Sequence, residues 1–296
     1  LVHLEDNQIA LMHSSYFANI ANYNYIAFAK PLDNRSSVGV SFIRFGVDDI
    51  LDTTQLIDEQ GNVNYDRINL FSAADYALTF SYARKLPIDG LNYGVNAKVI
   101  RRVIGDFASS WGFGLDLGIQ FESKNDWQIG VMVRDITTTF NAWSINDEKF
   151  AQIQDAVEGK NQEVPEGTEI TIPKIQFGVS KLFTFNYDYT LRTEVDLNIR
   201  FEENNDIISS SFASINPALG FEFGYTDLVF LRAGMGNFQN ELQIDNSEQL
   251  SFQPSFGVGF KYRGIQLDYA FTDIGDQSVA LYSNVFSLKL DFSIFR

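Results

Sequence analysis

Two carboxylates in one polar run could divide acid and base chemistry between them. Glu194 and Asp196 stand two positions apart in the stretch 189–202, YTLRTEVDLNIRFE. Side chains two apart on an extended strand point to the same face, and neighbouring carboxylates can act as an acid–base pair. Arg192 and Arg200 share that face. Opposite charges on one face favour ion pairing over catalysis, so we expect these four side chains to pair.

The rest of the catalytic repertoire is sparse. The sequence has no cysteine and two histidines, His3 and His13, which excludes a thiolate zinc site and a cysteine nucleophile. His13 adjoins Ser14, but adjacent side chains on a strand point to opposite faces, so the two cannot act together. The acidic stretches lack the D-x-[DN]-x-[DN]-G spacing of a calcium loop. We therefore expect no enzymatic activity, cofactor or metal, with weak calcium binding as the alternative.

Glycines recur at alternate positions in two segments. Gly112, Gly114 and Gly118 share one face, and so do Gly257 and Gly259. No helical pattern follows these glycines, which argues against a phosphate-binding loop. Small side chains on one face of a strand are better explained by room for a plug segment or for strand curvature.

The elements that carry these residues alternate with period two almost throughout. In 189–202 the odd positions are mainly apolar and the even positions mainly charged, and four further segments repeat the pattern (111–122, 251–262, 265–272 and 286–295). Such strands are longer than the roughly 5–6 residues usual in globular proteins and match the roughly 9–11 that cross a bilayer. No run of 18 apolar residues predicts a transmembrane helix. An apolar face opposite a polar one indicates an outer-membrane barrel rather than a soluble sandwich.

The predicted fold is all-β: a transmembrane antiparallel up-and-down β-barrel of fourteen strands, formed by the single domain 1–296. Short turns alternate with longer loops, which places the short turns and both termini in the periplasm. We expect strands at 9–17, 22–31, 37–46, 72–84, 91–101, 110–122, 127–138, 172–183, 189–202, 212–225, 228–236, 251–262, 265–272 and 285–295.

Long extracellular loops are expected at 47–71, 141–171, 237–250 and 273–284, and they carry nearly all of the net charge of −16. An acidic surface argues against nucleic acid as a partner. Candidate partner contacts are Asp48, Asp49 and Asp52 in the first loop. A short helix at 146–157, capped by Asn146, would add a second set of contacts on one stripe: Phe150, Ile153 and Val157.

Strand parity also predicts two sets of residues in the membrane-spanning body. Charged side chains on the polar faces should point into the lumen; this luminal set is Lys98, Asp116, Arg192, Glu194, Asp196, Arg200, Glu222, Lys261, Asp268, Lys289 and Asp291. Aromatic rings beside the short turns should form a periplasmic girdle at the membrane interface: Tyr82, Tyr93, Trp127, Tyr187, Tyr189, Tyr225 and Tyr262.

The chain resembles the PorV/PorQ family of outer-membrane proteins of the type IX secretion system, which is related to the long-chain fatty-acid transporter barrels. The resemblance lies in the segments 28–45, 73–86, 94–100, 112–136 and 257–271. It implies a fourteen-stranded barrel in a Bacteroidetes-type outer membrane and a role in the export of surface proteins. In that family a plug segment usually precedes the first strand, whereas here the first strand is expected within about ten residues of Leu1.

Two functions follow from these expectations. The first is a component of the type IX secretion machinery that binds the large translocon barrel or exported cargo through its extracellular face. The alternative is a transporter or channel for hydrophobic small molecules. The alternative predicts a plug, an apolar pocket near the loops and a kinked strand that opens sideways, but the charged luminal set counts against it.

Overall fold

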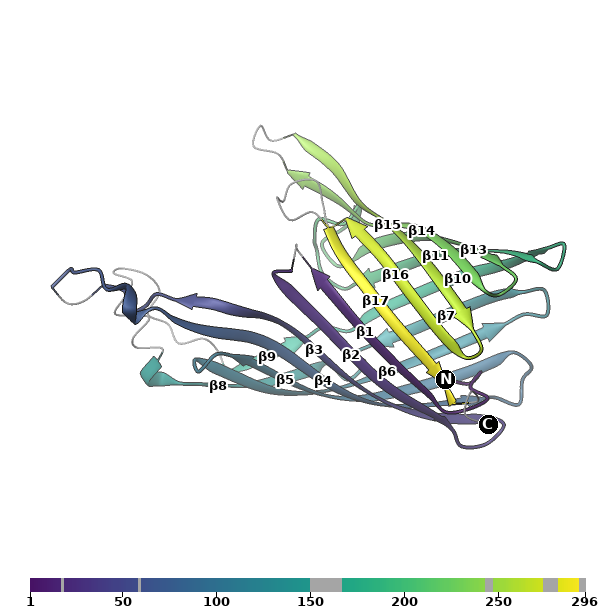
Figure 1. The fold of residues 1–296 in the computed structure, drawn as a ribbon, viewed down its shortest axis with the longest axis horizontal. Helices are drawn as coiled ribbons and strands as arrows, with labels where there is room; N and C mark the ends of the chain where they lie inside the picture. Colours follow the sequence, from purple (N-terminus) through teal and green to yellow (C-terminus); the bar gives the residue numbers. More distant parts are fainter. Residues whose placement is uncertain (17–18, 58–59, 150–166, 243–246, 274–281, 293–296) are drawn as a thin grey trace.

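A computed structural model describes residues 1–16, 19–57, 60–149, 167–242, 247–273 and 282–292. Every neighbouring pair of strands is antiparallel, and β1 (Gln8–Tyr16) pairs with β2 (Ala21–Pro31) on one side and with β17 (Tyr282–Asp291) on the other. Pairing of the first strand with the last closes the sheet into a barrel, and both chain ends lie at the same end of it (Figure 1). The predicted closed barrel of fourteen antiparallel strands is confirmed.

The remaining elements follow in chain order. They are β3 (Ser36–Asp52), η1 (Tyr65–Arg67), β4 (Asn69–Lys85), β5 (Leu91–Ile104), β6 (Ala108–Glu122), β7 (Trp127–Arg134), β8 (Thr139–Ile145), β9 (Thr168–Thr171), β10 (Lys174–Phe185), β11 (Tyr189–Arg200), β12 (Ile208–Ser209), β13 (Ser214–Tyr225), β14 (Val229–Leu242), β15 (Glu248–Tyr262) and β16 (Ile265–Asp273). Three short strands extend the barrel wall and are not counted among the fourteen spanning strands. β8 pairs with β6 beyond the end of β7, β9 pairs with β8, and β12 pairs with β13.

Tight turns join the strands at the end of the barrel that holds the chain ends, which we call the short-turn end. Two successive residues have positive φ in three of these connections: Asn186–Tyr187, Thr226–Asp227 and Arg263–Gly264. This conformation is that of type I′ turns, whose twist matches the twist of the strands they join. The turn chemistry therefore supports the predicted alternation of short and long connections.

The predicted loop boundaries at the opposite, long-loop end are wrong, because the hairpins continue further than the apolar pattern does. β3 and β4 pair as far as Asp52 and Asn69, after a register shift between Val47 and Ile50, so strand occupies much of the expected loop 47–71. β14 and β15 likewise extend into 237–250. The predicted strand 127–138 ends early, because β7 stops at Arg134. Beyond the bilayer both faces meet water, so alternation no longer marks the strand.

The outward face of the barrel is apolar and exposed. Phe113 and Phe256 expose 63% and 64% of their surface, and Leu231 exposes 55%. Apolar side chains exposed over a whole barrel wall are stable only in a lipid environment, so the chain is an outer-membrane β-barrel. Within the described residues, no helix has the length and apolar character needed to cross a membrane.

Residues 1–7 precede β1 at the short-turn end. Val2 is buried, and the side chain of Leu1 lies within van der Waals reach of the inward face of β3 at Gly39. His3 Nε2 lies 2.6 Å from Glu122 Oε1 at the end of β6. This segment therefore folds back into the mouth of the barrel.

Candidate functional site

The strand register places the luminal set on one face of the sheet. Lys98 and Asp116 lie on neighbouring strands and form an ion pair. The cross-strand register places Arg192, Glu222 and Asp268 on the same face of the sheet further around the barrel. We call this face inward. The remaining members of the predicted luminal set occupy positions of the same parity on their strands.

A buried charged triad on the inward face holds the wall together between β5, β6 and the end of β7. Lys98 Nζ lies 2.8 Å from Asp116 Oδ1 and 2.6 Å from Asp135 Oδ1, and all three side chains expose about a tenth of their area or less. The backbone N–H of Asp135 donates to Asp116 Oδ1 at 2.9 Å, and the Thr139 hydroxyl donates to Asp135. Because the charges compensate one another, the triad can remain buried.

The triad sits at a break in the seventh spanning strand. β6 pairs with β7 up to Leu117 and Val133, and then with β8 from Phe113 and Phe140, so residues 134–139 stand opposite only residues 114–116. Asp135 and Thr138 have positive φ inside this bulge. On its other side, residues 135–138 face only residues 172–173. The ladder is thus interrupted on both sides of 135–138, and the bulge turns Asp135 inward.

Glycine makes room for this bulge. A Cβ at Gly114 would lie 2.7 Å from Lys98 Cε and would also clash with the Thr139 hydroxyl, and one at Gly112 would clash with the Asn141 side chain. The glycine stripe of β6 therefore accommodates inward side chains of the bulge and of β8. At Gly112 and Gly114 this explains the small residues without a plug segment.

A second charged group, the arginine cluster, joins β13, β14 and β16. Arg232 Nε donates to Glu222 Oε2 at 2.6 Å, and Arg232 Nη1 donates to Asp268 Oδ1 at 2.5 Å. The two strands β14 and β16 are separated by β15, and a Cβ at Gly259 would lie 2.9 Å from Arg232 Nη1. Glycine on β15 thus lets the guanidinium reach across one strand to the second carboxylate.

The predicted pairing within 189–202 is wrong. In the part of the chain that the structure describes, Glu194 and Asp196 have no cation within 4.0 Å, and Arg192 and Arg200 have no carboxylate within that distance. Side chains two apart on a strand point in parallel, so an oppositely charged residue on a neighbouring strand is the more favourable partner for a salt bridge. Across from Glu194 and Asp196 stand Ser180 and Gly178 on one side, and Gly220 and Ala218 on the other.

The unpaired carboxylates of β11 border two interior cavities. One of about 690 Å³ lies against β13, β14 and β15, and the other of about 720 Å³ lies against β5, β6, β7 and β10. Arg192, Glu194 and Asp196 line both cavities. Leu1 and Val2 form part of the second cavity's wall. The lumen therefore contains space on both sides of β11, with polar groups facing it.

Sequence reasoning missed several inward charges, and parity could have found most of them. Arg232 alternates with the apolar residues Leu231 and Ala233, in phase with the other inward positions of β14. Arg134 and Lys174 stand at the ends of strands whose parity is equally clear. Asp135 carried no such signal, because a bulge cannot be read from alternation.

The expected girdle residues stand at strand ends or in turns at the short-turn end, with rings that contact one another. Tyr82 and Tyr93 lie 6.3 Å apart between ring centroids, and Tyr189 and Tyr225 lie 5.1 Å apart. Lys181 Nζ lies 5.3 Å from the Trp127 ring. Tyr187 and Tyr262 are exposed.

The expected partner contacts are only partly placed. Asp48, Asp49 and Asp52 lie on β3 rather than in a loop, and Arg44 binds Asp48 at 2.6 Å, which lowers the pKa of the Asp48 carboxyl. A helical turn at 147–149 begins as predicted, with Lys149 N donating to Asn146 Oδ1 at 3.3 Å. Phe150, Ile153 and Val157 lie outside the described residues.

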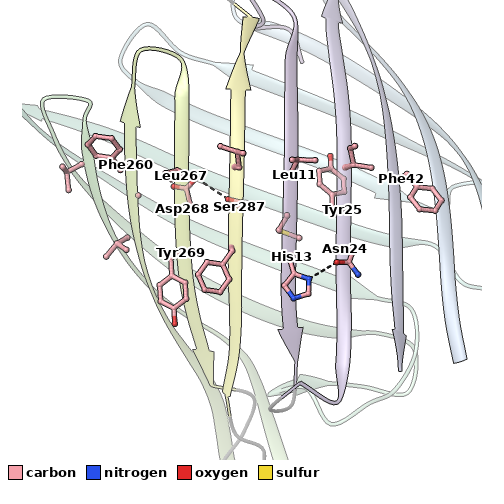
Figure 2. A pocket seen from close by; sticks show the side chains of 17 residues that line it. Leu11, His13, Asn24, Tyr25, Phe42, Phe260, Leu267, Asp268, Tyr269 and Ser287 are labelled. Atoms are coloured by element: carbon pink, nitrogen blue, oxygen red, sulfur yellow. Dashed lines mark hydrogen bonds between the residues drawn. The ribbon is translucent and has the colours of Figure 1, made fainter. Parts of the chain in front are cut away.

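A further hollow of about 830 Å³ lies on the outside of the wall over β16, β17, β1 and β2 (Figure 2). Most of its lining side chains belong to the outward face, among them Leu11, Phe260 and Leu267. His13 Nδ1 and Asn24 Oδ1 are 2.8 Å apart at its edge. This hollow faces the membrane, so it is not part of the lumen.

No group of three or more potential metal ligands occurs among the residues whose positions the structure gives. In that same part of the chain, His3 lies before β1 beside Glu122, and His13 lies on the outward face of β1 beside Asn24.

Comparisons with known proteins identify the fold. No protein-family model matches the sequence, and no curated protein sequence does. Among solved structures, the Pseudomonas putida toluene transporter TodX is similar with a TM-score of 0.57 and 11% identity, over 97% of this chain and 88% of that one. The monoaromatic hydrocarbon channel CymD has a TM-score of 0.57 and 10% identity, over 99% and 90%. A Pseudomonas aeruginosa FadL homologue has a TM-score of 0.51 and 12% identity, over 98% and 91%. At these identities the likeness is one of fold.

Proposed function

We propose that this barrel is an outer-membrane channel for small hydrophobic compounds. The observation that carries the proposal is the likeness of the whole barrel to structures whose printed names are toluene transporter and monoaromatic hydrocarbon channel. The likeness extends over nearly all of this chain and most of each neighbour, so it covers the complete wall. This reading takes precedence over the secretion role that the sequence resemblance implies.

Two features of the barrel support a transport role. Interior cavities of about 690 and 720 Å³ provide space for small solutes on both sides of β11. The interrupted ladder at residues 135–138 is a kink in a spanning strand, as the transporter alternative predicts. Such a kink gives solutes a place at which to leave the lumen through the wall.

The test uses site-specific blocking of the lumen, which the absence of native cysteine makes possible. A Cβ at Gly130 would meet no atom within 4 Å, and Gly130 lines the second cavity. Labelling of Gly130→Cys with a bulky maleimide should abolish toluene uptake into vesicles whose outer leaflet is lipopolysaccharide. The matched control is Val131→Cys, one position along β7 and outward, where labelling should leave uptake unchanged.

Equal toluene uptake by labelled Gly130→Cys and unlabelled protein would refute a luminal route. Uptake no faster than in vesicles without the protein would refute the transport function itself. Correct folding of each variant is checked by its heat-modifiable mobility in gel electrophoresis.

A second candidate function, binding of secretion-system proteins or cargo, is favoured by one feature. The β3–β4 hairpin extends beyond the neighbouring strands and carries Asp48, Asp49 and Asp52 (Figure 1). An acidic projection could dock a basic partner surface. Affinity purification from native membranes in mild detergent tests this candidate: a secretion component that is retained by the native chain and lost on substitution of the three aspartates with Asn would support it.

A further inference from the structure

Three cations lie side by side on the inward face at the long-loop ends of β7, β10 and β11. The register places Lys174 directly opposite Arg134 on one side and directly opposite Arg200 on the other. Cross-strand neighbours have their Cβ atoms roughly 4.5–5.5 Å apart, so the three side chains form one contiguous patch. We call Arg134, Lys174 and Arg200 the cationic row.

No described residue supplies a counter-charge to the cationic row. Within the described ranges, none of its three side chains has a carboxylate within 4.0 Å, whereas Lys98, Arg102 and Arg232 on the same face are ion-paired. Like charges placed directly opposite one another destabilise a sheet. The next residue across from Arg200 is Ser214, whose buried hydroxyl has no hydrogen-bond partner among the described residues. In the part of the chain that the structure describes, the row is thus a set of donors without a carboxylate partner.

An aromatic wall faces the row across the lumen. Tyr16, Tyr23 and Phe45 occupy inward positions of β1, β2 and β3; the Phe45 ring centroid is 6.2 Å from that of Tyr16 and 6.3 Å from that of Tyr23. In Figure 1 the strands β1–β3 and the strands β7, β10 and β11 form opposite sides of the barrel.

Open space adjoins the row on the luminal side. The second interior cavity, of about 720 Å³, is lined by Met132, Gln176 and Asn198. These are the next inward positions along β7, β10 and β11 from the three members of the row. A solute held at the row therefore has direct access to the cavity.

We propose that the cationic row and the facing aromatic wall form an entry site for aryl carboxylates, aromatic compounds that carry one carboxylate. Arginine binds the two oxygens of a carboxylate through its planar fork, and lysine adds a point charge. Aromatic rings across the lumen offer a surface on which the ligand's ring can stack. In a narrow lumen the unpaired charges also raise the local concentration of anions. This inference rests on the proposed function and extends its substrate class to aromatic compounds that carry a carboxylate.

The experiment compares benzoate, toluene and acetate in vesicles whose outer leaflet is lipopolysaccharide. The test variant is Arg134→Gln with Lys174→Gln and Arg200→Gln. Its matched control removes three outward cations instead: Arg44→Gln with Arg101→Gln and Lys181→Gln. Benzoate uptake should fall by roughly tenfold or more in the test variant and stay close to native in the control, since the site loses its charged donors. Toluene uptake should be unchanged in both.

A second variant separates aromatic recognition from charge. Tyr23→Ala should slow benzoate uptake and leave acetate unchanged, and Tyr23→Phe should restore benzoate uptake because the ring is retained. If acetate and benzoate fall equally in the test variant and Tyr23→Ala changes neither, the row is a general anion filter and the assignment to aryl carboxylates is overturned.

The two proposals fail in different ways. Benzoate uptake unaffected by loss of the row overturns the entry site, while toluene uptake above that of protein-free vesicles still supports the hydrocarbon channel. Benzoate uptake that depends on the row, without toluene uptake, supports the entry site and refutes the hydrocarbon channel. The test variant relieves like-charge repulsion, so a failure to fold is not expected of it.

Discussion

The arginine cluster and the cationic row both place arginine on the inward face of the barrel, yet only the arginine of the cluster is ion-paired among the described residues. Arg232 on β14 reaches Glu222 at 2.6 Å and Asp268 at 2.5 Å, across a glycine of β15. In the register of their strands, Arg200, Lys174 and Arg134 stand opposite one another and Ser214, and none stands opposite a carboxylate among the described residues. The difference does not lie in the parity of any single strand. It lies in which strands the register places side by side.

This comparison separates charges that stabilise the barrel from charges that are available to solutes. A paired cation has its donors satisfied by the wall, so it contributes to folding and offers little to a ligand. An unpaired row costs stability and keeps its donors for an anion. The following predictions test that distinction, from the largest expected effect to the smallest.

Loss of the buried cation in the triad should have the largest effect. Lys98→Met leaves Asp116 and Asp135 buried without compensation, and we expect it to lower the free energy of unfolding by about 3–5 kcal/mol. Urea titration of the detergent-solubilised barrel, followed by tryptophan fluorescence, measures this. Adding Asp116→Asn and Asp135→Asn to the same chain should recover part of the loss. A stability equal to that of the native chain would show that the triad is not a structural element.

Loss of the cation in the arginine cluster should lower the free energy of unfolding by less than loss of Lys98, because the members of this cluster are about a quarter to a third exposed. Arg232→Met should lower the free energy of unfolding by about 1–3 kcal/mol, since two carboxylates lose their charged donor. The same urea titration measures it. Arg232→Lys keeps the charge, but a lysine cannot donate to both carboxylates as the guanidinium does. Its free energy of unfolding should therefore lie between those of the native chain and Arg232→Met. An effect as small as that of the outward control Arg101→Gln would remove the contrast with the row.

The cationic row should respond in the opposite direction. Lys174→Glu places a carboxylate between Arg134 and Arg200, and we expect the barrel to gain about 0.5–1 kcal/mol in free energy of unfolding. The measurement is again the urea midpoint. The same variant should lose benzoate uptake, so stability should rise while transport falls. A loss of stability would mean that the row already has a counter-charge.

The smallest effect on stability is expected at Asp33, whose hydrogen-bond donors are backbone N–H groups and a hydroxyl rather than a cation. At the turn before β3, Asp33 accepts from the N–H groups of Arg35 and Ser36 at 2.7 Å and from the Ser36 hydroxyl at 2.6 Å. The Ser36 hydroxyl, followed by these backbone donors, lowers the pKa of the Asp33 carboxyl below 3.8.

The sign of the pH effect follows from that shift. A carboxyl whose folded pKa is lowered stabilises the turn fully above its ordinary pKa and loses this contribution as the pH falls through the folded value. Carboxyl-carbon NMR of Asp33 should titrate below 3.8, and Ser36→Ala should raise the pKa because the largest cause is removed. Titration at or above the ordinary value would contradict the turn geometry.

Much of the fold is predictable from the sequence because a bilayer imposes a simple rule. Alternate residues of each spanning strand must be apolar, and short type I′ turns must return the chain. Strands such as Tyr189–Arg200 and Trp111–Phe121 show this rule plainly, and it also assigns Lys98, Asp116 and Asp268 to the inward face. Beyond the membrane the rule no longer applies, which is why the extensions of β3–β4 and β14–β15 were missed.

The sequence by itself therefore determined the number of spanning strands, their order and the face of the charges that lie on regular strands. Only the tertiary structure decided which charges meet. Pairing depends on cross-strand register, on a bulge that turns Asp135 inward, and on glycines at 114 and 259 that let long side chains pass. Register arises from contacts between segments far apart in the chain, for example Lys174 with Arg134 and Arg232 with Asp268, and no local periodicity encodes it.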